Sequence, residues 1–159
     1  MTMTQAMIEA DERVPIIRIT RDFAATPAQL LAAHTDPNLF VQWVGPNGME
    51  TEISTWDARD GGEWRFVQRL DGDEYGFRGC FHEVSERRIV QTFSFDGDPD
   101  GVALETLTFE DLGDGHTRLH AQSLVDSFEG RDAWLRSGME VGVRESYAKL
   151  DRVLSDDAG

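Results

Sequence analysis

The stretch that decides the fold is SGMEVGVRESYAKLDRVL, residues 137–154, near the end of the chain. In it and just before it, apolar and small residues recur every three or four positions, which places them on one side of an α-helix. These residues are Leu135, Met139, Gly142, Val143, Ser146, Tyr147, Leu150 and Leu154. Charged residues such as Arg144 and Asp151 fall on the other side. The pattern predicts one long amphipathic helix over residues 130–154.

Upstream of this helix, apolar and polar residues alternate in segments that are separated by turn residues. A period of two predicts half-buried β-strands. The first begins at Pro15, and six more cover residues 49–57, 63–70, 75–84, 88–95, 102–112 and 116–125. Their short links favour antiparallel hairpins. We therefore predict a seven-stranded antiparallel sheet.

Two helix starts lie between the first two of these strands. Thr26-Pro27-Ala28-Gln29 has the form of a capping box, with proline at the first helical position. Asp36-Pro37 repeats the signal and predicts a second short helix that carries Phe40 and Trp43. The Gly-Pro-Asn-Gly turn at 45–48 ends this helix. Trp43 itself is either core packing or the rim of a binding site.

These elements predict an α+β fold in which a curved sheet wraps around the long helix and the two short helices close one end. Residues 1–14 are polar and aperiodic and predict a loose N-terminal arm. Residues 15–155 form one predicted domain, because no linker or repeat interrupts them. This architecture often leaves a gap between sheet and helix, and we expect the functional site there.

The composition narrows the range of partners. Thirty acidic residues against 15 basic ones give a net charge of −15, which repels nucleic acid and anionic membranes. No apolar run approaches the ~20 residues that cross a bilayer. The acidic N-terminus does not resemble a signal peptide, so we expect a cytoplasmic protein. The single cysteine, Cys80, cannot form an internal disulfide.

No strong catalytic or metal-binding motif is present in the sequence. Its four histidines are scattered. His116 and His120 share a predicted strand and one face of it, but about 13 Å separates them, too far for one metal ion. We expect neither a metal ion nor another cofactor. The polar candidates for catalysis are His120, Glu83 and Tyr147.

Aromatic residues, by contrast, gather on shared faces of the predicted strands. Several aromatic side chains with glycines among them favour the walls of a cavity, although ordinary core packing is the alternative for each one. Mid-strand Gly79 permits either close backbone approach or room for a ligand. The candidate ligand-binding residues are Trp43, Trp56, Trp64, Phe66, Phe77, Gly79, Phe81, Phe93, Phe95, Leu107, Trp134, Met139 and Gly142.

Five stretches of the chain resemble a known family. They are DPNLFVQWVGPNG (36–48), GGEWRF (61–66), YGFRGCFHEVSERRIVQTFSF (75–95), LTFEDLGDGHTRL (107–119) and SGMEVGVRESYAKLDRVL (137–154). They look like the bacterial branch, named after the activator of Hsp90 ATPase homologue, of the START-like (SRPBCC, helix-grip) superfamily. The resemblance covers residues 17–154 and implies a helix-grip fold with a deep cavity between sheet and helix.

The sequence departs from the family pattern at two positions. Val44 stands where relatives commonly have the second tryptophan of Trp-Trp-Gly-Pro. In the last helix, Gly142-Val143 stands where they commonly have Gly-Trp. Both changes replace an aromatic side chain by valine, so we expect a pocket mouth of different shape.

Three functions stay open. The resemblance implies binding of apolar or aromatic small molecules in many relatives and polyketide cyclisation or dehydration in some. An interaction with an Hsp90-type ATPase is suggested by the family name alone. A homodimer through an exposed sheet edge or helix is a further option.

Overall fold

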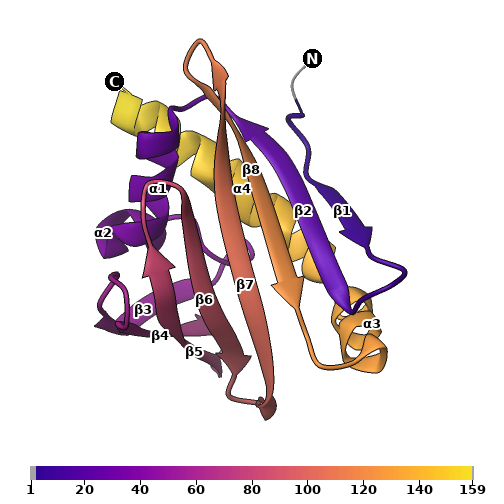
Figure 1. Ribbon diagram of the computed structural model, residues 1–159. Coiled ribbons are helices and arrows are strands. Elements are labelled where there is room, and N and C mark those ends of the chain that lie inside the picture. The colour runs from indigo at the N-terminus through magenta and orange to yellow at the C-terminus, as the bar shows by residue number, and fades with distance from the viewer. Residues whose placement is uncertain (1–2, 159) are drawn as a thin grey trace.

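The computed structural model describes residues 3–158. One antiparallel sheet runs through it, with strands β1 (Met7–Ala10), β2 (Ile16–Phe23), β3 (Glu50–Trp56), β4 (Glu63–Leu70), β5 (Asp73–Val84), β6 (Arg88–Phe95), β7 (Asp98–Gly113) and β8 (His116–Leu124). The strand order is β1-β2-β8-β7-β6-β5-β4-β3 (Figure 1). Every neighbouring pair is antiparallel, which confirms the predicted arrangement.

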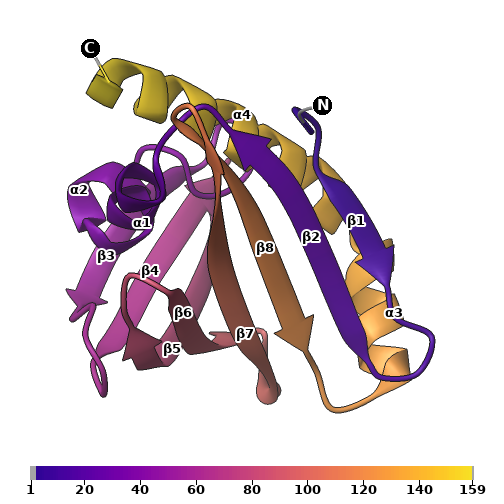
Figure 2. The same ribbon diagram turned by 45° about the horizontal axis from the view of Figure 1, so that its top comes forward.

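Four helices accompany the sheet in the described part of the chain: α1 (Pro27–Thr35), α2 (Pro37–Phe40), α3 (Phe128–Arg136) and α4 (Met139–Ala158). Figure 2 shows α4 running across one face of the curved sheet, with α1 and α2 beside β3 and β4. The α+β, helix-grip expectation is confirmed.

The predicted number of strands was wrong by one. The sheet has eight strands, and the additional strand, β1, lies inside the segment 1–14 that we expected to be a loose arm. Met7 to Ala10 pair with residues 17–20 of β2. Most β1 side chains are exposed because the strand forms one edge of the sheet, and its four residues are too few to establish a period of two.

The single long helix predicted over 130–154 is two helices. Ser137 caps the C-terminus of α3, and Gly138 follows with a φ of 90°. This left-handed conformation ends a helix and favours glycine. The apolar periodicity continues through the break, so the sequence pattern alone could not reveal it.

The predicted capping box at the start of α1 is confirmed. The Gln29 amide N–H donates to Thr26 Oγ1 at 3.2 Å, and the Thr26 amide N–H donates to Gln29 Oε1 at 2.9 Å. Asp36 caps α2 by accepting from the Asn38 amide at 2.9 Å. However, α2 ends at Phe40, so Trp43 lies beyond the helix in the following turn.

Two tryptophans anchor the C-terminal end of α1, where carbonyl groups have no partner within the helix. Trp43 Nε1 donates to the Ala33 carbonyl at 2.9 Å, and Trp56 Nε1 donates to the Thr35 carbonyl at 2.7 Å. These bonds fix α1 against β3 and against the turn after α2. They also orient both indole rings.

The core has two parts. One is built around Leu30, Leu119 and Leu150, which are fully buried where α1, β8 and α4 meet. The other is built around Trp64 and Phe81 from the sheet. Phe40, Leu107 and Phe109 contact both parts.

Candidate functional site: a cavity between the sheet and α4

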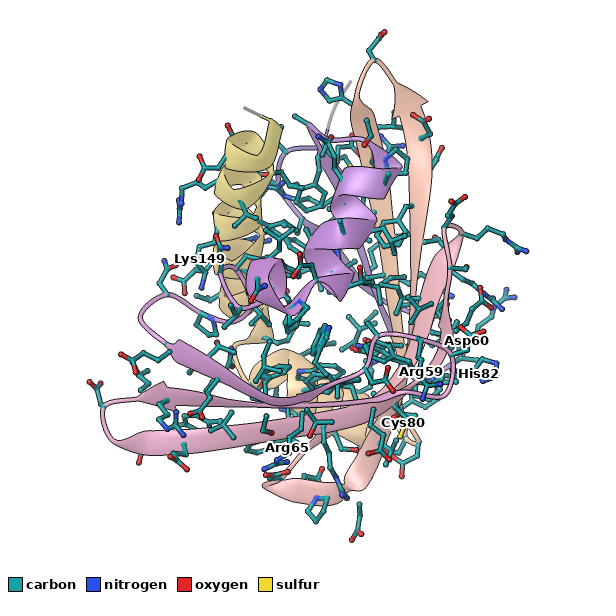
Figure 3. All side chains as sticks on the ribbon, turned by 90° about the vertical axis from the view of Figure 1, so that its left-hand side faces the viewer. Arg59, Asp60, Arg65, Cys80, His82 and Lys149 are labelled. Carbon is teal, nitrogen blue, oxygen red and sulfur yellow. The ribbon has the colours of Figure 1, made fainter. Side chains whose placement is uncertain are left out.

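A cavity of about 470 Å³ lies between the sheet and α4. Its volume is within the range of small-molecule sites, ~300–1,000 Å³. Strands β2 to β8, helices α1 and α2, and the α3–α4 junction all contribute side chains to its wall. Figure 3 shows that the labelled Arg65, Cys80 and His82 lie on the opposite, outer side of the sheet. Cys80 is exposed there as a free thiol.

Most of the predicted binding residues border this cavity. They are Trp43, Trp56, Trp64, Phe66, Phe77, Phe93, Leu107, Trp134, Met139 and Gly142. Val44 and Val143, the two departures from the family pattern, also line it. Contact with a ligand remains a prediction for all of them.

Gly79, Phe81 and Phe95 are not part of the lining. A Cβ atom at Gly79 would lie 2.0 Å from the Thr92 carbonyl oxygen, so this glycine serves close approach between β5 and β6. Phe81 is buried against Trp56, with ring centroids 5.9 Å apart. Phe95 packs on Phe77 at 5.4 Å, farther along β6.

Trp43 proves to be both core and cavity wall. Its side chain is buried in the first part of the core, and its ring packs on His34 and Phe40 with centroid distances of 4.9 and 5.3 Å. The same ring borders the cavity. The two alternatives that the sequence left open are therefore not exclusive.

The Gly-Pro-Asn-Gly turn at 45–48 forms part of the cavity wall through Gly45 and Pro46. It is tied to α4, because Lys149 Nζ donates to the Pro46 carbonyl at 3.3 Å and Glu145 Oε1 accepts from the Asn47 amide at 3.0 Å. Lys149 is visible on α4 in Figure 3. Gly45 has a φ of 88°, and a Cβ there would overlap the Gln68 side chain. The turn thus requires glycine.

Glu105 is the polar residue of the cavity that sequence reasoning missed. It sits on β7 directly opposite Gln91 of β6 and Ser123 of β8. Gln91 Nε2 donates to Glu105 Oε1 at 2.9 Å, and Ser123 Oγ donates to Glu105 Oε2 at 2.9 Å. All three residues line the cavity, so they form one polar row across a wall that is mostly apolar.

A signal for this row was present in the sequence. Leu107 is one of the predicted binding residues, and a period of two puts Glu105 on the same face of the strand. Gln91 stands two residues before Phe93 in the same way. Counting only aromatic and aliphatic residues along each strand left these polar positions out.

The electrostatic setting of Glu105 is unusual for a carboxyl group. Burial raises its pKa above the ordinary range, and the hydrogen bonds from Gln91 and Ser123 oppose this rise. Among the described residues that line the cavity, none is a lysine or an arginine. No salt bridge among the described residues involves Glu105.

Two further ionisable side chains border the cavity. Burial, and secondarily the charge of Glu105, raise the pKa of Tyr147 above its ordinary value, so the phenol keeps its proton. His34 is buried, and its Nδ1 lies 2.8 Å from the Leu30 carbonyl oxygen and therefore donates to it. Burial lowers the pKa of His34 to about 4, which makes the imidazole neutral near pH 7. His34 stands four residues after Leu30, on the same helix face.

Two of the three catalytic candidates lie outside the cavity lining. His120 is exposed, and its Nε2 contacts Glu110 Oε1 at 2.8 Å. Hydrogen bonds from Ser85 and Arg88 lower the pKa of Glu83, contrary to the raised value that a general base would need. Only Tyr147 of the three borders the cavity.

Comparison with known proteins agrees with this architecture. The family model described as "Activator of Hsp90 ATPase homolog 1-like protein" matches residues 24–155, and the chain belongs to this family. The family resemblance seen in the sequence is thereby confirmed. Membership fits a START-like domain that binds a ligand. The comparison with curated proteins gave no match.

Several solved bacterial structures share the fold. A Rhodobacter sphaeroides protein is 28% identical, with a TM-score of 0.84, and the match covers 94% of this chain and 98% of that one. An Arthrobacter aurescens protein is 24% identical, with a TM-score of 0.85 and coverage of 94% and 91%. The AHSA1 protein from Silicibacter pomeroyi is 24% identical, with a TM-score of 0.73 and coverage of 89% and 99%.

Two kinds of feature are absent from residues 3–158. No helix there is both long and apolar enough to cross a membrane. No three His, Cys, Asp or Glu side chains in that range are grouped as metal ligands.

Proposed function

We propose that this protein binds an apolar or aromatic small molecule in the cavity between the sheet and α4. One observation carries the proposal: a cavity of about 470 Å³ is walled by aromatic rings from both layers of the fold. All four tryptophans of the chain border it. Cavities of this size and composition are typical ligand sites. The cytoplasmic location and the homodimer stay predictions.

A substitution that fills the cavity tests this function. Gly142 borders the cavity, and a Cβ there meets Pro46 only at an ordinary 3.5 Å. Gly142→Phe should therefore occupy the site without breaking the fold. The neighbouring Val141 is 60% exposed, so Val141→Phe is a matched control.

The measurement is titration with 1-naphthalenemethanol, a neutral aromatic probe, together with thermal unfolding of each variant. We expect the wild type and Val141→Phe to bind it saturably, and Gly142→Phe to lose at least tenfold in affinity at a melting temperature no lower than that of the wild type. Equal binding by a folded Gly142→Phe variant would contradict the proposal.

A second candidate function, a polyketide cyclase- or dehydratase-like enzyme, is favoured by one observation. Glu105 and Tyr147 place ionisable groups in the cavity, and acid–base chemistry requires such groups. Only the family name suggests an interaction with an Hsp90-type ATPase, and a shared fold does not imply a shared function.

A further inference from the structure

We propose that the ligand carries a basic nitrogen and that Glu105 binds this cation while the aromatic walls hold the apolar part. This inference rests on the proposed function and names the chemical class of the ligand. It follows from the contacts of Glu105, from the charges that face it, and from the surrounding rings.

Two hydrogen bonds hold the Glu105 carboxylate in place, and it can accept further hydrogen bonds. Gln91 donates one hydrogen bond to one carboxylate oxygen, and Ser123 donates one to the other, each at 2.9 Å. Each carboxylate oxygen accepts about two hydrogen bonds, so each retains a free acceptor position. These two donors favour the ionised form and oppose the rise in pKa that burial causes, and a bound cation would favour that form further. The group is therefore oriented before any ligand enters.

The described residues supply no cation for this carboxylate. Of the ionisable residues in the lining, His34 is neutral and donates its Nδ1 proton to its own helix, and Tyr147 is a protonated phenol. Arg21 approaches the Tyr147 ring at 6.0 Å, but it pairs bidentately with Asp151 at 2.6 and 2.7 Å. Glu105 is half-buried, and a carboxylate withdrawn from water without a counter-ion is unfavourable, so a cationic ligand lowers that penalty.

The surroundings favour a cation over an anion as well. Phe93 and Trp134 stack in the cavity wall with ring centroids 6.3 Å apart, and the faces of such rings attract ammonium groups. The net charge of −15 raises the local concentration of cations and repels carboxylates. Without lysine or arginine in the lining, a fatty acid or aromatic acid would find no counter-ion.

Three probes of one shape separate this inference from the proposed function: 1-naphthylmethylamine, neutral 1-naphthalenemethanol and 1-naphthoate, each titrated calorimetrically at pH 7. For the wild type we expect the amine to bind at least tenfold more tightly than the alcohol, and the carboxylate to bind most weakly. Equal binding of amine and alcohol would overturn the inference and leave the proposed function intact. If none of the three binds, the proposed function fails, and the inference with it.

The Glu105→Gln variant tests whether Glu105 is the residue that binds the amine. It should lower the affinity for the amine at least tenfold and leave that for the alcohol within twofold. Glu110→Gln, on the outer face of the same strand, removes the same charge and should change neither. If Glu105→Gln binds the amine as well as the wild type, the inference is wrong. The wild-type comparison of amine and alcohol keeps the test decisive if Glu105→Gln does not fold.

Discussion

At the scale of single residues, the cavity depends on side chains that serve structure and site together. Trp43 is anchored by its hydrogen bond to Ala33 and packs in the core, yet one side of its ring faces the cavity. Trp134 borders the same cavity but is only half-buried, and its ring stacks on Phe93. The two tryptophans therefore differ in how strongly stability and binding are linked.

Alanine substitutions should separate these contributions. Trp43→Ala removes a buried ring and its hydrogen bond, so we expect a loss of about 3–5 kcal/mol in the free energy of unfolding together with weaker probe binding. Trp134→Ala should weaken binding with a much smaller loss of stability. Urea unfolding and titration with 1-naphthalenemethanol measure both. A Trp43→Ala variant of wild-type stability would show that the ring is not part of the core.

At the scale of elements, turns and breaks contribute to the wall of the site beside the strands and helices. The α3–α4 break brings Ser137, Gly138 and Met139 to the cavity wall. The sequence predicted this region as helix correctly, because its apolar spacing is strong. It could not show the break, since a glycine can also lie inside a continuous helix, as Gly142 does in α4.

Two glycine substitutions should have opposite effects. Gly138 has a φ of 90° and open space around its missing Cβ, so Gly138→Ala should cost about 1–2 kcal/mol in the free energy of unfolding for conformational reasons alone. Gly142 lies inside α4 without a positive φ, and Gly142→Ala should gain about 0.5–1 kcal/mol through helix propensity. Chemical unfolding of both variants checks the signs. Stabilisation by Gly138→Ala would contradict the assigned break.

At the scale of the whole molecule, the apolar skeleton of the fold was predictable and its polar details were not. Alternation placed β2 to β8 in order and put Leu107 on the inner face, because burial of one sheet face imposes a period of two. Strand β1 was not predicted, because an edge strand does not need an apolar face. Glu105 was not predicted because a carboxyl group in a strand is usually exposed. The period of two puts it on the same face as Leu107, but its hydrogen-bond partners follow from the strand register with Gln91 and Ser123.

The central claim is that an apolar molecule occupies the space between the sheet and α4, and contacts from a bound ligand test it most directly. With 1-naphthalenemethanol added to methyl-labelled protein, we predict intermolecular nuclear Overhauser effects to the methyl groups of Ile89, Leu107 and Val143, which line the cavity. Val102 and Leu104 on β7 are exposed, at 50% and 43%, and should show none. Effects confined to Val102 and Leu104 would place the probe on the surface and contradict the account.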